Sequence, residues 1–262
     1  MKLIKKFLKN ILVVIFNLFT KSELLSKVLT LIGTYDFYEK KIFQGKNFYL
    51  LKKNDVTKFR NDTIFTKEPE TIEWIKNMQP DSTFWDVGAN VGLYSIVAAL
   101  TKSKQVVAFE PSYFNLTILS KNIFKNDLSD KIIISPIPIN QNSKRGLFYL
   151  QSTEEGYALA NFKENKTDDV DKKFKYNTIS TSLDEFYENY HKLKPDYLKI
   201  DVDGNEIKII KGASKVLNIV KSVLIEANSE LDEKEIIDLM KTFNLILFKK
   251  YSQTLNLIFI RE

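Results

Sequence analysis

Short apolar runs alternate with segments of helical periodicity after Pro80, and this alternation limits the chain to one class of fold. The apolar runs are Thr83–Val87, Gln105–Phe109, Lys131–Ile134, Asp196–Ile200 and Ser222–Ile225. The first two and the last two are each followed by a segment that can begin a helix. Strands separated by helices pair in parallel, with the helices as crossovers. The sequence therefore predicts an α/β fold with a doubly wound, mostly parallel sheet.

The end of the chain breaks this alternation. Two apolar runs, Leu245–Lys249 and Leu255–Ile260, are joined by a short polar turn that leaves no room for a helix. Strands joined in this way are antiparallel. We therefore expect a seven-stranded sheet with a terminal antiparallel strand, in a domain that spans residues 81–262.

Two other regions fall outside the alternation. For residues 33–80 the pattern predicts a small N-terminal cap region, with a strand near Asn47–Leu51 and a helix over about Glu68–Met78. Residues 151–178 are rich in Lys, Asp, Glu and Asn and show no regular period. Irregular polar segments of this length often carry function, so we expect a long loop or a lid on the substrate side.

Residues 1–32 predict a basic amphipathic helix. Apolar residues from Leu3 to Phe19 recur at intervals of three and four, and lysines occupy the opposite face. Residues 1–60 hold 13 Lys/Arg against 4 Asp/Glu, a net charge of +9, which leaves −3 for the rest of a chain whose total is +6. Such a helix could bind an anionic membrane surface through residues 1–30, or dock on the body or on a second copy in a homo-oligomer.

Composition excludes several chemistries. The chain has no Cys and one His, His191, so disulfides, thiolate nucleophiles and three-His metal sites are impossible, and a reducing compartment is favoured. Proton transfer would fall to Asp, Glu, Tyr or Lys. The N-terminal lysines alternate with aliphatic residues, with no aromatic stacking platform, so we expect no nucleic-acid partner.

The first motif that carries chemistry is Asp86-Val87-Gly88-Ala89-Asn90-Val91-Gly92, which closes a strand and opens a helix. Glycines at this point permit a tight turn and close approach of a ligand to free N–H groups. Glu110 ends the second strand, where an acidic side chain can accept both hydroxyls of a ribose. Together they predict a nucleoside site without a phosphate cradle. The alternative is a purely structural turn with Asn90 as the helix N-cap.

The second motif is Lys199-Ile200-Asp201-Val202-Asp203-Gly204-Asn205-Glu206. Lys199, Asp201 and Asp203 share the parity of one strand face, and charges on a central strand are costly unless they pair or face a cleft. Asp203 and Glu206 could instead form a capping box for the next helix. Asp201 is not explained by capping, although Lys199 could simply neutralise it.

Three further features have simpler explanations. Glu226 and Asn228, at the next strand end, could offer oxygen ligands to a divalent cation, but Asn228 also begins a helix, so we assign no metal ligands. Ser182-Leu183-Asp184-Glu185 predicts a capping box. His191 is interpreted as an exposed residue at a helix end.

These motifs resemble those of the FkbM-type methyltransferases. The resemblance runs in order from about Asp81 to Asn228 and rests on four segments: Phe84–Ser95, Ala108–Pro111, Thr181–Asp184 and Leu198–Glu206, with Lys211-Gly212-Ala213 after them. It implies a Rossmann-like fold and S-adenosylmethionine as cofactor. Carried over by position, the cofactor-binding residues are Asp86, Gly88, Asn90 and Gly92 on the methionine and ribose side, and Glu110 with Pro111 at the ribose. Asp203 stands where the family usually has Glu, and Asn205 where an apolar residue is common.

The resemblance also implies O-methylation of a hydroxyl, usually on a sugar or another glycosylated or polyketide product. We therefore expect a methyltransferase that acts on a glycan or glycolipid precursor, in the cytoplasm or at the inner face of the membrane. Asp201 is the predicted base, Asp203 and Glu206 are acceptor-binding or capping residues, and Lys199 is the charge partner. The alternative is a non-catalytic scaffold or partner subunit that keeps the nucleoside site.

Overall fold

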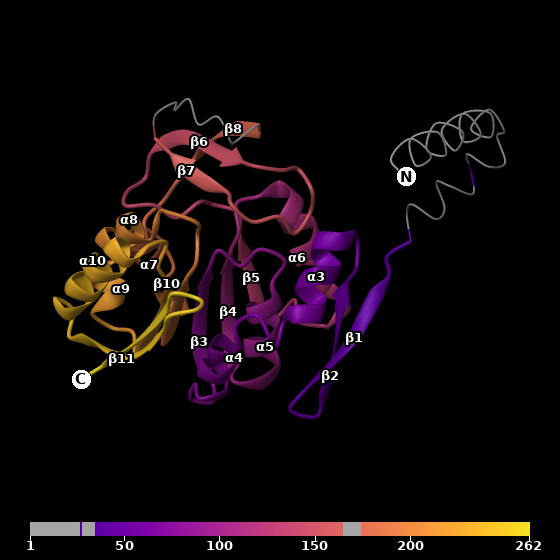
Figure 1. Cartoon of the computed structure of the whole chain (residues 1–262), viewed down its shortest axis with the longest axis horizontal. Coiled ribbons are helices and arrows are strands. Elements are labelled where there is room, and N and C mark those ends of the chain that lie inside the picture. The colour runs from indigo at the N-terminus through magenta and orange to yellow at the C-terminus, as the bar shows by residue number, and fades with distance from the viewer. Residues whose placement is uncertain (1–26, 28–34, 165–173) are drawn as a thin grey trace, which may run out of the picture. The chain divides into compact units, whose positions relative to one another are not determined.

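The structure is a computed structural model, and it describes residues 27, 35–164 and 174–262 (Figure 1). The chain divides into two compact units, Met1–Phe37 and Tyr38–Glu262. The predicted helix within residues 1–32 lies outside the described residues. Among the described residues, no helix is long and apolar enough to cross a membrane.

A seven-stranded sheet forms the centre of the second unit. Its strands are β3 (Ser82–Val87), β4 (Ser103–Phe109), β5 (Ile132–Ser135), β9 (Tyr197–Ile200), β10 (Ser222–Glu226), β11 (Leu245–Tyr251) and β12 (Asn256–Arg261). Their order is β11-β12-β10-β9-β3-β4-β5, and β12 pairs antiparallel with both of its neighbours while the other pairs are parallel. This confirms the predicted Rossmann-like fold class and its terminal hairpin.

Helices cover both faces of this sheet, so the central strands are buried on both sides (Figure 1). Phe84 and Trp85, neighbours on β3, belong to two separate cores. The core around Phe84 includes side chains of α4 (Pro69–Lys76), α5 (Leu93–Thr101) and α6 (Tyr113–Lys125). The core around Trp85 includes side chains of α7 (Leu183–Asn189), α8 (Glu206–Lys211), α9 (Ser214–Leu217) and α10 (Glu230–Lys241). Alternation of side chains across a strand requires this two-sided packing.

The N-terminal cap region consists of a hairpin and two helices. β1 (Tyr38–Phe43) and β2 (Lys46–Leu51) pair antiparallel, and α3 (Asp55–Thr63) and α4 follow them. The predicted strand and the predicted helix over about 68–78 are therefore present. Trp74 of α4 joins the core around Phe84, and its indole N–H donates to the Ser222 hydroxyl at 2.9 Å.

Residues 151–178 differ from the prediction of an irregular loop. A three-stranded antiparallel sheet of order β7-β6-β8 is inserted between β5 and α7, built from β6 (Arg145–Leu150), β7 (Asn161–Lys163) and β8 (Phe174–Ile179). These strands have a weak sequence pattern because β7 has three residues and every residue of β8 is exposed or half-buried. Regular apolar alternation arises only where one face of a strand packs on a core.

Two smaller predictions are confirmed. Ser182 and Glu185 form the predicted capping box at the start of α7. His191 is exposed and begins the short 3₁₀ turn η1 (His191–Leu193).

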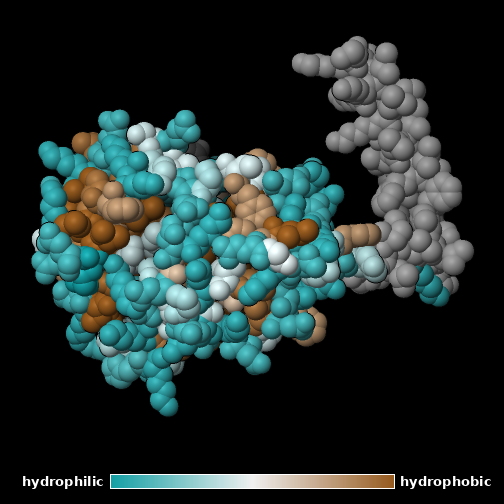
Figure 2. All heavy atoms as spheres, turned by 90° about the horizontal axis from the view of Figure 1, so that it is seen from below, coloured by the Kyte–Doolittle hydropathy of each residue, from teal (hydrophilic) through white to brown (hydrophobic). Residues whose placement is uncertain are grey.

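Figure 2 shows a face on which hydrophilic residues separate several apolar patches.

Candidate functional site

The two sequence motifs meet at the carboxyl ends of adjacent parallel strands. Val87 of β3 pairs with Ile200 of β9, so the residues that follow, Gly88 and Asp201, lie side by side. Gly88 has a φ of 89°, and a Cβ added to it would lie 1.7 Å from the Asp201 carbonyl oxygen. The glycine is therefore required by the close approach of the β9 end, which places Asp201 next to the β3–α5 turn, residues 88–92.

A cavity opens at this edge of the sheet, as expected for ligand sites in doubly wound folds. Seven of the predicted site residues line it: Gly88, Asn90, Glu110, Pro111, Lys199, Asp201 and Asp203. Its walls also include apolar side chains from β4, the β5–β6 connection and the inserted sheet, such as Phe109, Ile137, Phe148 and Phe162. One cavity thus combines a carboxylate-rich end with an apolar end, a combination common in small-molecule sites.

Asp86, Gly92 and Glu206 lie behind the cavity wall. The Asp86 carboxylate is buried, with Oδ2 accepting a 2.6 Å hydrogen bond from the Ser95 hydroxyl of α5, and burial raises the pKa of this carboxyl. Its Oδ1 has no hydrogen-bond partner among the described residues. Gly92, with a φ of 85°, is the N-cap of α5, so the interpretation of Asn90 as N-cap is wrong.

Glu110 is buried and holds the β3–α5 turn. Its Oε2 accepts the Asn90 backbone N–H at 2.8 Å and its Oε1 accepts the Ser112 N–H at 2.7 Å. Burial raises the pKa of Glu110 to about 7, although these N–H donors oppose that rise. Each carboxylate oxygen has a second acceptor position, so Glu110 can still accept ligand hydroxyls.

Lys199 and Asp201 form an ion pair beneath the cavity. The Lys199 ammonium is 1% exposed, lies 2.6 Å from Asp201 Oδ2 and is 5.1 Å from the centre of the Tyr94 ring. Burial alone would lower the pKa of Lys199, but Asp201, Asp86 and Glu68 together raise it, so the ammonium stays charged. Burial alone would raise the pKa of Asp201, but Lys199 keeps it below its ordinary value.

The predicted capping box at Asp203 and Glu206 is wrong. The β9 strand ends at Ile200, and Asp203 adopts a left-handed conformation with a φ of 58°, so strand parity does not reach it. Asn205 is the N-cap of α8, without a side-chain capping bond. Glu206 instead accepts the backbone N–H groups of Val202 and Gly204 and thereby shapes the β9–α8 loop, residues 201–205.

Asp203 binds a segment that crosses the cavity. We call residues 152–161 the strap. Asp203 Oδ2 accepts the Leu159 N–H at 2.7 Å. The Tyr157 carbonyl accepts the side-chain amides of Asn90 and Asn115 at 3.2 Å each, and Asn115 Oδ1 accepts the Gly156 N–H at 2.8 Å. The strap therefore connects the β3–α5 turn, α6 and the β9–α8 loop, and part of the predicted lid region does cover the site.

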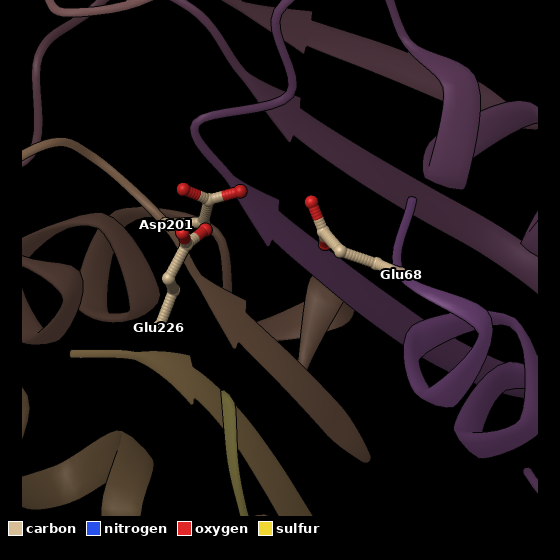
Figure 3. Close-up of side chains that lie close together, drawn as sticks. All are labelled: Glu68, Asp201 and Glu226. Carbon is tan, nitrogen blue, oxygen red and sulfur yellow. The ribbon is translucent and has the colours of Figure 1, made fainter. Parts of the chain in front are cut away.

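Two more carboxyl groups face Asp201, and sequence reasoning placed neither at the reaction centre. Glu226 ends β10, and Glu68 precedes α4 in the cap region; one oxygen from each and one from Asp201 all lie within 4.8 Å of one another (Figure 3). Carboxyl groups so arranged can hold a cation. Here the ammonium groups of Lys199 and Lys67 contact Asp201 and Glu68 at 2.6 and 2.7 Å, so we assign no metal ligand.

The comparison with known families identifies the chain. The model of the methyltransferase FkbM domain matches residues 86–250, more than half of the 262 residues. The chain belongs to the FkbM methyltransferase family. The match begins at Asp86 and includes both motifs, whereas Glu68 and the rest of the cap region lie outside it. The resemblance stated from the motifs is thereby confirmed.

Individual relatives are distant. The hexuronic acid methyltransferase AglP of Haloferax volcanii is 26% identical over 171 residues, which cover 65% of this chain and 66% of that protein, just under two thirds of its length. The crystal structure of a methyltransferase FkbM from Methylobacillus flagellatus KT gives a TM-score of 0.49 at 14% identity, over 70% of this chain and 44% of that one. The crystal structure of a NADB-Rossmann superfamily protein from Streptococcus agalactiae gives a TM-score of 0.47 at 12% identity, over 73% of this chain and 68% of that one.

Proposed function

We propose that this family member is an S-adenosylmethionine-dependent methyltransferase that O-methylates a sugar hydroxyl in a glycan or glycolipid precursor. The observation that carries the proposal is the position of Asp201. Its carboxylate lies beside the β3–α5 turn and shares one cavity with the buried Glu110. A group that can accept a proton is thus adjacent to a site with the features of a nucleoside pocket.

The residues present fit the cofactor. Glu110 offers a buried carboxylate for ribose hydroxyls, and the left-handed Gly88 and Gly92 give the turn its tight path. Phe109 and Ile137, with Phe148 and Phe162 of the inserted sheet, offer an apolar slot suited to a base. When bound, S-adenosylmethionine supplies a methyl group on a sulfonium, whose in-line transfer depends mainly on positioning.

Asp201 is the proposed base. A sugar hydroxyl is a weak nucleophile and gains from a proton acceptor within hydrogen-bond reach. Lys199 keeps Asp201 ionised, and the side chain remains 26% exposed toward the cavity. The chain has one His, and this residue lies outside the cavity in the exposed turn η1 after α7. A carboxylate base is therefore consistent with the composition.

A sugar acceptor is supported by AglP, which is named for action on hexuronic acid. The cap region supplies Arg60, Lys67 and Glu68 to the cavity wall, outside the segment matched by the family model. We therefore propose that these cap residues contribute to the choice of acceptor.

Substitution of the base tests the proposal. Asp201→Asn should abolish methyl transfer to glycan acceptors, because an amide cannot take the hydroxyl proton, while the affinity for S-adenosylhomocysteine stays nearly unchanged. Glu230→Gln, a change on the first turn of α10, is the matched control and should leave both properties intact. Turnover at the wild-type rate by Asp201→Asn would remove Asp201 from the catalytic role.

We further propose that residues 1–30 attach the enzyme to an anionic membrane surface, where a glycolipid acceptor would be found. The support is the amphipathic pattern and the net charge of +9 in residues 1–60. Flotation with anionic liposomes should recover the full-length protein and not a chain that lacks the first 30 residues. Equal recovery of both in the unbound fraction would exclude the membrane and favour docking on protein.

A further inference from the structure

The Glu226 carboxyl lies against Asp201 at the ends of two neighbouring strands. Ile225 of β10 pairs with Ile200 of β9, which brings the next residue of each strand side by side. One carboxyl oxygen of Glu226 lies within 4.8 Å of a carboxyl oxygen of Asp201 (Figure 3). Two carboxyl groups this close repel each other when both are ionised, so the arrangement favours one proton on the pair, which one carboxyl group can donate to the other.

The surrounding charges determine which of the two carries that proton. Lys199 contacts Asp201 at 2.6 Å and favours its ionised form. Lys67 contacts Glu68 at 2.7 Å. Glu226 is half-buried and faces the carboxyl groups of Asp201 and Glu68 (Figure 3). The ammonium groups of Lys199 and Lys67 contact those two carboxyl groups. The proton therefore stays on Glu226.

We propose that Glu226 is a positioning residue for methyl transfer, which donates its acid proton to Asp201 and, together with Lys199, orients the Asp201 carboxylate toward the acceptor. This inference rests on the proposed function. The groups that face Glu226 are Asp201 and Lys199 from β9 and Glu68 and Lys67 from the start of α4. Burial, followed by the Asp201 carboxylate, raises the pKa of Glu226 to about 9.

The proton balance of the pair is simple. Before reaction, the two carboxyl groups hold one proton and one negative charge. Asp201 takes the hydroxyl proton while the acceptor oxygen bonds to the methyl carbon and the sulfur keeps the electron pair of the broken bond. The pair then holds two protons, and one of them returns to water before the next turnover. No other reactant is needed.

A titration that needs no turnover tests the protonation. In full-length protein labelled with carbon-13 at the Glu side-chain carboxyls, NMR should show one carboxyl that titrates near pH 9. That signal should be absent from Glu226→Gln and should titrate at lower pH in Asp201→Asn. Glu110→Gln assigns the signal that titrates near pH 7. Titration of the Glu226 signal in the ordinary acidic range would overturn the proposal.

Kinetics test the consequence for the reaction. Glu226→Gln keeps an N–H donor for Asp201, so its kcat at neutral pH should stay within about threefold of wild type, without the wild-type decline above about pH 9. Glu226→Ala loses the donor, and its kcat should fall about tenfold or more with KM for the cofactor unchanged. Equal kcat in Glu226→Ala and wild type, or equal loss in both variants, would contradict the positioning role. Absence of turnover in wild type would count against the proposed function alone, because the NMR titration is independent of it.

Discussion

The Lys199 ammonium lies 2.6 Å from the Asp201 carboxylate, two residues further along the same strand edge. A charged lysine that is 1% exposed on the central strand of a sheet needs a balancing charge, and Asp201 is the carboxylate in direct contact with it. The pair also fixes the ionisation of the proposed base. The stability of the fold and the ionisation of the proposed base therefore both depend on the Lys199–Asp201 contact.

Lys199→Met should destabilise the protein at neutral pH. It leaves the Asp201 carboxylate in a low-dielectric setting without its cation, and because 26% of that side chain is exposed to the cavity, the expected loss is about 3 kcal/mol. Urea unfolding measures it. The double variant Lys199→Met/Asp201→Asn removes both charges and should recover more than half of the loss. A double variant as unstable as the single one would show that the two charges are not coupled.

Gly88→Ala should impair both stability and cofactor binding. The new Cβ would lie 1.7 Å from the Asp201 carbonyl oxygen, so the β9 end must move away from the turn. Gly45→Ala is the matched control, since Gly45 has a φ of 75° and open space around it, and it should cost only the left-handed strain of about 1–2 kcal/mol. Thermal unfolding and calorimetric titration compare the two variants. Equal losses would exclude the close approach as the reason for this glycine.

Cofactor affinity should depend on pH through Glu110. The pKa of this buried carboxyl is raised to about 7, so the folded protein holds its neutral form below that pH, and a neutral carboxyl is the weaker acceptor for ribose hydroxyls. Affinity for S-adenosylhomocysteine should therefore be full above pH 7 and fall as pH drops, by up to about tenfold per pH unit. Calorimetric titration across this range measures the slope. Glu110→Gln should bind weakly without the slope, and a slope that survives in this variant would assign the dependence to another group.

Asp203 should act through the strap rather than on the acceptor. Its carboxylate accepts the Leu159 N–H at 2.7 Å, and removal of that acceptor should release the strap from the β9–α8 loop. Asp203→Ala should therefore speed proteolytic cleavage within residues 152–161 and raise the dissociation rate of S-adenosylhomocysteine, by about threefold to tenfold for one lost hydrogen bond to a charged group. Asp203→Asn keeps an acceptor oxygen and should lie between Asp203→Ala and wild type. Identical cleavage rates in all three proteins would show that the Asp203–Leu159 hydrogen bond does not hold the strap.

The sheet could be predicted from the sequence because its strands are buried on both faces. Ser222–Ile225 is a continuous run of small and apolar residues, and Thr83–Val87 is one apart from Asp86; such runs are typical of strands that are buried on both faces. The inserted sheet could not be predicted in the same way. Its β8 strand exposes Phe174 and Ile179, so no regular alternation of apolar and polar residues marks it.

The site was predictable where it depends on strand ends. Gly88, Glu110 and Asp201 follow neighbouring parallel strands, so the topology alone brings them together. The position of Glu68 at the site could not be predicted, because Glu68 reaches Asp201 through the packing of the cap region on the sheet. The local sequence signal near it is Pro69, which marks a helix start. The capping box at Asp203 was predicted wrongly because the left-handed backbone at this residue has no signature in the residue type.

The most direct test of the account is calorimetric titration of the full-length protein with S-adenosylmethionine and S-adenosylhomocysteine, beside Glu110→Ala. Glu110 is buried at the centre of the proposed nucleoside site and touches the β3–α5 turn through the Asn90 N–H. We predict micromolar binding of both ligands by the wild type and its loss in the variant. Absence of binding by the wild type, or equal binding by both proteins, would contradict the cofactor site proposed here.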